Sequence, residues 1–484
     1  MTKQEEPLYT EGLWKYFKEI SDIPRESGNE GGVREYLLSF AAEHGYTALT
    51  DAAGNVIMKI PATPGKEHVA PLAFQGHMDM VCVKKEGSDH NFLTDGITLI
   101  REGDILRADG TTLGADNGIA LALMLDLFSD SRAVHGPLEG IFTVEEETGL
   151  TGAFAVEPEM IQSRRLINLD SEEEGIFYIG CAGGNEVDGD LIISETEIDP
   201  DTNQWEITVH GLLGGHSGGE IHTQRGNAIK VMARILSSLR GDDSFRIIQI
   251  DGGVRRNVIP STCTARIVSS LDGDSLKEKV DSVCSIVQQE LKYVESSIVC
   301  SVDNSAVKAK TSLSQEQSTG LIRSLLLAPH GVLRMSEALE NVVETSSNLA
   351  IISTEKGHVH MVSSHRSSVE SARDHAADVT EEAFRVCGAE VVRGGSYPAW
   401  TPNPESPLAR FCAAAYRSSD KKEPVITAIH AGLECGIIND RVKGMDSVSL
   451  GPDIEGVHSV NERLSISSSE RVASFIRHLC SIVE

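Results

Sequence analysis

The chain has 484 residues with 72 acidic against 43 basic side chains, and its net charge of −29 argues against nucleic acid or an anionic membrane as a partner. Its N-terminus lacks the basic start and apolar core of a signal peptide, no apolar run is long enough to cross a bilayer, and its nine cysteines include no Cys-x-x-Cys pair. We therefore expect a cytoplasmic protein with reduced cysteines, of roughly three domain-sized units at about 150 residues each.

The first part of the chain alternates helices with strands. Apolar periodicity and turn residues predict helices over 13–20 and 32–44, strands over 56–60 and 72–75, a helix over 119–128, and strands near Ile141 and Leu166. Such alternation is typical of a sheet whose strands are joined by covering helices. We therefore predict an α/β domain with a mixed, mostly parallel sheet and helices on both of its faces.

The middle of the chain has a different rhythm. It predicts a strand over 204–209, a helix over 228–239, strands over 245–250 and 262–268, a helix over 276–291 and a strand over 297–302. This β-α-β-β-α-β order is that of the ferredoxin-like unit. A similar rhythm follows, with a helix over 321–327, strands over 349–354 and 358–363, a helix over 369–386 and a strand over 390–393. We therefore predict an α+β lid built from two ferredoxin-like units.

The end of the chain returns to the first pattern. A proline-rich stretch over 394–404 precedes a helix over 408–416, a strand over 425–428 and a helix over 469–483. The predicted domains are therefore an α/β domain made of 1–185 and 400–484, and an inserted lid and substrate-binding domain over 186–399.

An acidic turn, Thr143-Val-Glu-Glu-Glu-Thr-Gly149, follows one of the predicted strands. Its three adjacent carboxylates repel one another, and neither Lys nor Arg occurs between Ala133 and Gln162 to offset them. A bound metal ion would offset them and would leave a spare carboxylate beside it to move protons. A solvated acidic loop is the alternative explanation of this turn.

Other candidate metal ligands also stand where apolar strands end. His77 ends one strand, and Asp79 can reach its second ring nitrogen because residues i and i+2 of an extended segment point the same way. Asp116 lies in a glycine-rich turn before a helix, where it would either cap that helix or bridge two metal ions. Asp170 follows another strand, and His458 lies in a loop after a late one. Ligands bind beyond the carboxyl ends of the strands in open α/β sheets, so this recurrence favours a site.

The order of these motifs resembles a known family. Gly-His-Met-Asp, Gly-Ala-Asp-Asn-Gly, Glu-Glu-Thr-Gly and a late Gly-x-His are similar to the motifs of the di-zinc peptidases that include aminoacylase, glutamate carboxypeptidase and the cytosolic dipeptidases. The segments Gln75–Cys82, Thr111–Gly118 and His430–Gly436 resemble more narrowly the bacterial aminoacyl-histidine (Xaa-His) dipeptidase branch. The resemblance extends over essentially the whole chain.

The resemblance implies two divalent metal ions, most simply zinc, although cobalt and manganese accept similar ligands. The implied ligands are His77 and Asp170 for one ion, Glu147 and His458 for the other, and Asp116 as the bridge between them.

It also implies Glu146 as the general base and Asp79 as the residue that orients the metal-bound histidine. The family has a pair of glutamates directly before an x-Gly, and Thr148-Gly149 therefore selects Glu146 and Glu147 and leaves Glu145 without a known role. A hydroxide bridging the two ions would attack the peptide carbonyl, and Glu146 would pass a proton to the leaving amine.

Four further residues carry implied roles in substrate binding and transition-state stabilisation. His216, in a glycine-rich loop, would help to stabilise the transition state, the alternative being a flexible hairpin with an incidental histidine. Asn257 and Arg366 would bind the substrate carboxylate. Glu434 would bind the substrate ammonium, unless it caps a helix.

The predicted function is hydrolysis of unblocked dipeptides, of the Xaa-His or β-alanyl-His type and extending to others. An N-acyl amino acid deacylase or an aminotripeptidase that uses the same site is the enzymatic alternative. A metal- or peptide-binding module without catalysis is the alternative from another class. Members of the family dimerise through a small lid, whereas a doubled lid would imitate that partner within one chain, and we expect a homodimer.

Overall fold

The structure is a computed structural model that describes residues 9–420 and 422–483. The chain divides into two compact units. Unit 1 comprises Met1–Gly180, Pro402–Ala428 and Leu433–Glu484, and unit 2 comprises Cys181–Thr401 and Ile429–Gly432.

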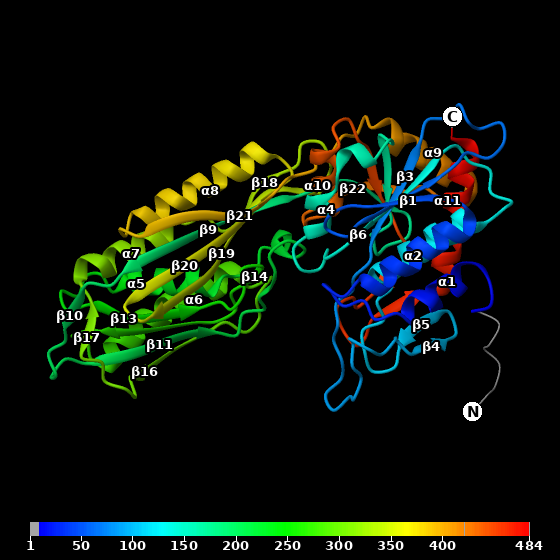
Figure 1. Cartoon of the computed structure of the whole chain (residues 1–484). Coiled ribbons are helices and arrows are strands. Elements are labelled where there is room, and N and C mark those ends of the chain that lie inside the picture. The colour runs from blue at the N-terminus through cyan, green and yellow to red at the C-terminus, as the bar shows by residue number, and fades with distance from the viewer. Residues whose placement is uncertain (1–8, 421, 484) are drawn as a thin grey trace. The chain divides into compact units, whose positions relative to one another are not determined.

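Unit 1 is an α/β unit assembled from both ends of the chain. Its N-terminal elements are α1 (Gly12–Ser21), α2 (Gly31–His44), β1 (Thr47–Thr50), β2 (Val56–Ile60), β3 (Leu72–His77), β4 (Leu99–Glu102), β5 (Ile105–Ala108), α3 (Ala115–Ser129), β6 (Leu138–Thr143), α4 (Thr151–Ala155), β7 (Arg165–Asn168) and β8 (Ile176–Cys181). Its C-terminal elements are α9 (Pro407–Asp420), β22 (Val425–Ile429), α10 (Glu434–Arg441), β23 (Asp446–Ser449), β24 (Ile454–Glu455), β25 (Arg463–Ser465) and α11 (Ile466–Ile482). Figure 1 shows the C-terminal helix α11, in red, among the blue N-terminal elements of this unit.

The sheet of unit 1 has the strand order β1-β2-β6-β3-β7-β23-β8-β22. The four central strands, β6, β3, β7 and β23, pair in parallel. Antiparallel pairs flank them, because β1 and β2 form a hairpin, β2 runs against β6, and β8 runs against β23. The sheet is therefore mixed, as predicted, but only its four central strands are parallel.

The central strands are buried because helices cover them. Every residue of β3 and β6 is buried, as expected of strands covered on both faces. Helix α3 is buried along nearly its whole length and packs against β3, α1 and α11, which explains why its sequence is apolar all round. The carboxyl ends of β3, β6 and β7 consequently lie side by side at one edge of a rigid layer.

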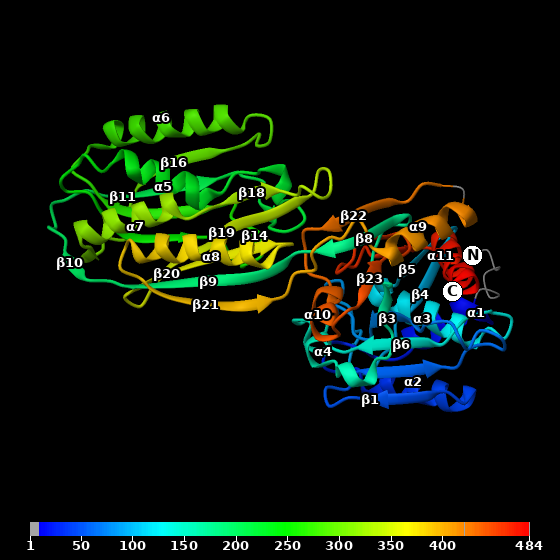
Figure 2. The same cartoon turned by 90° about the horizontal axis from the view of Figure 1, so that it is seen from above.

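Unit 2 is an α+β unit. Its strands and helices are β9 (Gly183–Ile192), β10 (Glu195–Glu197), β11 (Gln204–His210), β12 (Gly215–His216), α5 (Ala228–Ser238), β13 (Arg246–Gly252), β14 (Val258–Ile259), β15 (Cys263–Val268), α6 (Gly273–Leu291), β16 (Val299–Asn304), β17 (Thr311–Leu313), α7 (Gln315–Leu327), β18 (Gly331–Met335), β19 (Val343–Glu355), β20 (His358–Ser367), α8 (Glu370–Arg385) and β21 (Glu390–Tyr397). The four helices form one layer in the order α6-α5-α7-α8, which Figure 2 shows from top to bottom.

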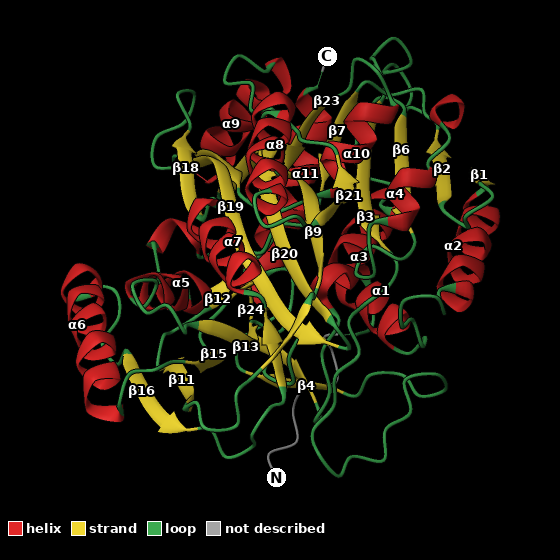
Figure 3. Cartoon of the chain, turned by 90° about the vertical axis from the view of Figure 1, so that its left-hand side faces the viewer, coloured by secondary structure: helices red, strands yellow, loops and turns green. Residues whose placement is uncertain are grey.

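One continuous sheet supports this helical layer. Its strand order is β16-β11-β15-β13-β19-β20-β9-β21, with β18 paired to β19. The sheet has two halves of four strands, which meet where β13 pairs with β19. When the strands of each half are numbered along the chain, both halves read 4-1-3-2 from the outer edge of the sheet towards its centre. In Figure 3 the long strands β19 and β20 lie side by side in yellow, as their pairing requires.

Strand β9 is the main element that the sequence did not predict. It belongs to the half of the sheet that contains β19, β20 and β21, although in the chain it precedes all four strands of the other half. Its sequence is rich in glycine and in acidic residues, among them Glu186, Asp188 and Asp190, and such residues disfavour strands on intrinsic preference. Its pairing with β20 and β21 overrides that preference.

Candidate metal centre and active site

The site begins at His77, the last residue of the buried strand β3. Its Nδ1 lies 3.2 Å from Asp79 Oδ1 and 3.1 Å from the Asp79 carbonyl oxygen. Asp79 therefore reaches the second ring nitrogen of His77, as its spacing predicts. The same carboxylate accepts hydrogen bonds from the backbone N–H groups of Glu146 (3.0 Å) and Glu147 (3.2 Å) and from the Ser27 hydroxyl (2.7 Å). Asp79 thus joins the histidine to the acidic turn.

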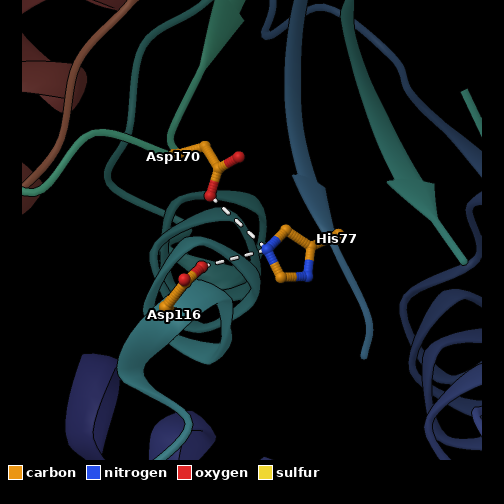
Figure 4. A group of neighbouring side chains, drawn as sticks. All are labelled: His77, Asp116 and Asp170. Atoms are coloured by element: carbon orange, nitrogen blue, oxygen red, sulfur yellow. Dashed lines mark hydrogen bonds and ion pairs between the residues drawn. The ribbon is translucent and has the colours of Figure 1, made fainter. Parts of the chain in front are cut away.

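The other ring nitrogen of His77 faces two carboxylates. Its Nε2 lies 3.0 Å from Asp116 Oδ1 and 3.5 Å from Asp170 Oδ1, and Figure 4 shows both contacts. Asp170 follows β7, the parallel neighbour of β3, and Asp116 lies at the start of α3. The tertiary fold therefore brings three separate segments together around one imidazole.

Asp116 contacts a second imidazole through its other oxygen. His458 Nε2 lies 3.1 Å from Asp116 Oδ2 and 3.0 Å from Glu147 Oε1. The two carboxylate oxygens of Asp116 therefore face the two imidazoles and not the backbone N–H groups of α3, and this geometry disfavours the capping interpretation of Asp116. Asp116 thus lies between the two pairs of residues, His77 with Asp170 and Glu147 with His458, that the family resemblance assigns to separate ions.

The pKa values of the cluster show that it stabilises positive charge. Burial by itself lowers the pKa of His77, but the surrounding carboxylates, Asp170 foremost, raise it well above its ordinary value. Hydrogen bonds to Asp116 and Glu147 raise the pKa of His458 to about 10. Burial, aided by Asp116 and Glu147, raises the pKa of Asp170 to about 6. A cation in the cluster would relieve the repulsion among these acids.

The donor atoms fit divalent metal ions. A neutral imidazole nitrogen forms one ordinary hydrogen bond at most, yet the Nε2 of His77 and that of His458 each face two carboxylate oxygens at 3.0 to 3.5 Å. Ligand atoms of a tetrahedral ion bound at about 2.0–2.2 Å lie about 3.3–3.6 Å apart, close to these separations. Imidazole nitrogen combined with carboxylate oxygen is a set that zinc, cobalt and manganese accept.

The acidic turn contributes two of its three glutamates to this cluster. Glu146 and Glu147 form a ligand group with His77, and Glu147 forms another with Asp116 and His458. Glu145 belongs to none of the ligand groups found among residues 9–420 and 422–483; its backbone is left-handed, with φ of 48°, and its N–H donates to Glu30. Burial raises the pKa of Glu146 well above its ordinary value, against the lowering effect of His77.

Glu434 is completely buried at the start of α10. Its Oε2 accepts hydrogen bonds from Gln75 Nε2 (2.5 Å) and Thr143 Oγ1 (2.7 Å), while its Oε1 has no hydrogen-bond partner among the described residues. These partners come from β3 and β6, and no side-chain cap is found at the start of α10 among the described residues, so the helix-capping alternative is not supported. Burial raises the pKa of Glu434 to about 7.

A buried polar network, which the sequence analysis missed, continues from Glu434 across the central strands. Asn168 Nδ2 donates to Gln75 Oε1 (2.6 Å), and Ser449 Oγ donates to Asn168 Oδ1 (2.5 Å) and lies 2.7 Å from Ser171 Oγ. Its signal in the sequence is the pair of amide residues, Gln75 and Asn168, inside otherwise apolar strands. The network holds β3, β7 and β23 in register beneath the candidate site.

Comparisons with known proteins identify the family. The family described as Peptidase family M20/M25/M40 matches residues 73–481. The chain is 37% identical over 462 residues to the cytosol non-specific dipeptidase of Escherichia coli (strain K12), covering 95% of each. The chain belongs to this peptidase family. The prediction made from its motifs is confirmed, and the protein is a hydrolase.

Solved structures agree. The fold of this peptidase matches the crystal structure of aminoacylhistidine dipeptidase from Vibrio alginolyticus with a TM-score of 0.92 and 34% identity, covering 100% of this chain and 98% of that one. It also shares its fold with the aminopeptidase PepT from Bacillus cereus, with a TM-score of 0.58 and 18% identity. Within the described parts of the peptidase, none of the helices has the length and apolar character that a bilayer crossing requires.

The remaining predicted residues of this peptidase belong to unit 2. Asn257 and Arg366 line a common cavity of about 260 Å³, where Arg366 Nη1 donates to the Tyr397 hydroxyl (2.9 Å) and Arg366 Nε is buried without a partner among the described residues. His216 is not among the residues that line this cavity. The N–H groups of Gly218 and Gly219 donate to His216 Nδ1 at 3.2 and 3.0 Å, so the proton of the neutral ring is on Nε2. The roles of these residues stay predictions.

Proposed function

We propose that this peptidase hydrolyses dipeptides with free amino and carboxyl ends in the cytoplasm. The observation that carries the proposal is the convergence of two histidines with three carboxylates, where Asp116 contacts both imidazoles, and the partly buried acid Glu146 lies beside His77. The two relatives above carry the names non-specific dipeptidase and aminoacylhistidine dipeptidase. We therefore propose Xaa-His and β-alanyl-His dipeptides within a broader range of substrates.

We propose two zinc ions as the cofactor. His77 and Asp170 would hold one, Glu147 and His458 the other, and Asp116 would lie between them, as their contacts allow. When bound, such ions polarise the scissile carbonyl and lower the pKa of water to about 7. Cobalt or manganese would suit the same donor atoms.

Glu146 would then serve as the general base and acid. Its burial and raised pKa suit a carboxylate that takes a proton from the attacking water. The same proton would pass from the Glu146 carboxyl group to the leaving amine nitrogen as the peptide C–N bond breaks. Asp79 would keep His77 in position, because it binds the Nδ1 side of that ring.

Candidate residues exist for each end of the substrate. Glu434 would accept hydrogen bonds from the substrate ammonium through its Oε1, which has no hydrogen-bond partner in the described part of the chain. Arg366 lines the same cavity as Asn257, and its Nε has no acceptor among residues 9–420 and 422–483, so these two side chains would bind the carboxylate. The Nε2–H of His216 is a donor suited to an oxyanion.

We propose the domain boundaries and the domain roles that the sequence predicts. The catalytic domain would be 1–185 with 400–484, and 186–399 would be an inserted lid made of two ferredoxin-like units, in keeping with the two 4-1-3-2 strand sets. We propose a homodimer as the assembly. The molar mass of the purified full chain in solution, measured by light scattering, would test this.

A substrate panel on zinc-reconstituted protein tests the function. We expect hydrolysis of Ala-His and β-Ala-His, and little hydrolysis of a tripeptide or of N-acetyl amino acids. The N-acetyl amino acids lack the ammonium that Glu434 would bind. Preferred cleavage of the N-acetyl amino acids would instead establish a deacylase.

The matched variant is Glu146→Gln, which keeps the shape of the side chain and removes its basicity. We expect kcat for Ala-His to fall by about 10²–10⁴-fold while the zinc content measured by elemental analysis stays unchanged. Wild-type turnover in this variant would contradict the assignment of Glu146.

A further inference from the structure

Glu462 is a buried carboxylate that binds the backbone of the loop bearing Asp116. Its Oε2 accepts hydrogen bonds from the N–H groups of Leu113 (2.7 Å) and Gly114 (3.0 Å), and its Oε1 from those of Ala115 (2.8 Å) and Asp116 (3.3 Å). Only 3% of Glu462 is exposed. Four successive amides that converge on one carboxylate form the kind of concave backbone site that binds anions. The conformation of this loop therefore depends on an acid 346 residues further along the chain.

Arg25 binds the carbonyl side of the same loop. It is buried, and its Nη2 donates to the carbonyl oxygen of Gly114. Its Nη1 donates to the carbonyl oxygens of Met78 (3.1 Å) and Asp79 (2.9 Å), directly after His77. One guanidinium thus links the segment that follows His77 to the turn that precedes Asp116.

The loop that bears Asp116 is packed too closely at Gly114 to accept a side chain there. Gly114 has a φ of 68°, and a Cβ on it would lie 2.5 Å from Arg25 Nη2 and 2.6 Å from Met80 Sδ. Glu462 also stands four residues after His458, and its own N–H donates to the Ser459 carbonyl at 3.2 Å. The segment that supplies His458 to the site therefore also fixes the backbone from which Asp116 projects.

We propose that Glu462, together with Arg25, is a positioning residue that holds Asp116 where it faces both His77 and His458. Glu462 itself lies outside the ligand groups found among the described residues, so it acts through the loop backbone. The inference rests on the proposed function, because positioning of Asp116 matters only if Asp116 binds the metal ions. A purely structural role would instead lower stability without changing metal affinity.

The test is Glu462→Gln in the full chain, compared with Glu455→Gln as the matched control. Glu455 is exposed on β24 of the same segment. An amide at position 462 presents one oxygen and one NH₂ group to four N–H donors, so at least one pair of donors loses its acceptor. We expect zinc affinity, measured by competition with a chromophoric chelator, to weaken by about 10- to 100-fold in Glu462→Gln and to stay unchanged in Glu455→Gln.

Circular dichroism of the metal-free proteins shows whether each variant is folded. Should Glu462→Gln not fold without metal, Glu462→Asp, which keeps the charge but shortens the reach, is measured in its place and is expected to bind zinc more weakly than wild type. Wild-type zinc affinity in a folded variant at position 462 would overturn the inference while leaving the proposed function intact. Failure of the wild-type protein itself to bind zinc would overturn both.

Discussion

Asp79 connects the histidine and the acidic turn through a single carboxylate. One of its oxygens faces His77 Nδ1 and the Glu146 N–H, and the other faces the Ser27 hydroxyl and the Glu147 N–H. These contacts and the ring of His77 lower the pKa of Asp79 to about 2 against the effect of burial, so it is ionised at neutral pH. Both oxygens of the ionised Asp79 carboxylate therefore have hydrogen-bonding or ionic partners.

Asp79→Asn is expected to disturb both segments at once. An amide NH₂ at this position would face N–H donors of the turn or the ring nitrogen of His77, and metal affinity and kcat should each fall by about 10- to 100-fold. Zinc titration and steady-state kinetics measure the two effects. Ser27→Ala, which removes one hydroxyl contact only, is the control and should change them far less; equal effects in the two variants would refute the role of Asp79.

Glu434 predicts a pH dependence of stability in the metal-free protein. Its pKa rises from an ordinary 4.5 to about 7 on folding, because burial disfavours the ionised form. The folded state therefore holds a proton that the unfolded state has released between these pH values. The contribution of Glu434 to stability is fully present below pH 4.5 and is lost as the pH rises towards 7.

Glu434→Gln, which cannot ionise, should remove this dependence. Relative to the variant, the wild-type protein should lose up to about 3 kcal/mol of unfolding free energy between pH 4.5 and 7, at about 1.4 kcal/mol for each pH unit. Urea denaturation of the chelator-treated proteins at several pH values measures the difference. Parallel curves for the two proteins would show that Glu434 is ionised at no cost.

The packing of α3 on β3 determines where Asp116 lies. A Cβ on Gly76 would be 2.4 Å from Asn117 Oδ1 and 2.6 Å from Ala120 Cβ, so strand and helix approach as closely as a glycine permits. Asn117 in turn donates to the Leu169 carbonyl at 2.9 Å, beside Asp170. The first turn of α3 is therefore fitted between β3 and the end of β7.

Gly76→Ala should push α3 away from β3. We expect a loss of about 1–3 kcal/mol in unfolding free energy from overpacking, together with weaker zinc binding because Asp116 moves with the helix. Urea denaturation and zinc titration measure these effects. Gly241→Ala is the control, because a Cβ at that position would meet no atom of the described residues within 4 Å. A Gly76 variant as stable as that control would contradict the close packing.

Elements with a strong local signal were predicted with nearly correct bounds. The predicted strand over 56–60 coincides with β2, and the helix over 32–44 ends where Gly45 adopts the left-handed conformation that stops α2. Helix α7 was predicted too short, because the apolar run begins at Leu321 whereas the N-cap Ser314 and a polar first turn precede it. Strand β9 was missed altogether, since its acidic and glycine residues carry no strand signal of their own.

Each unit has the elements to fold around its own interior. Unit 2 contains a hydrophobic core formed between its helical layer and its sheet. All five predicted metal ligands belong to unit 1. Ligand binding stabilises only the structure that contains the site, by about 2.7 kcal/mol for each site when the free metal exceeds the Kd 100-fold.

Metal removal should therefore affect the two units differently. We expect a chelator to increase amide hydrogen exchange in β3 and β6 of unit 1 and to leave β19 and β20 of unit 2 unchanged. Exchange measured by mass spectrometry with and without zinc tests this. An equal loss of protection in both units would show that they unfold as one cooperative structure.

The family, the alternation of helices and strands, and the candidate ligands could all be predicted from the sequence, because strand ends, periodicity and short motifs are local properties of the chain. How these residues face one another is a property of the folded structure. Gln75 and Asn168 meet across paired strands, and Glu462 reaches a loop near Asp116 from the other end of the chain. Contacts of this kind depend on the packing of distant segments, which no local pattern records.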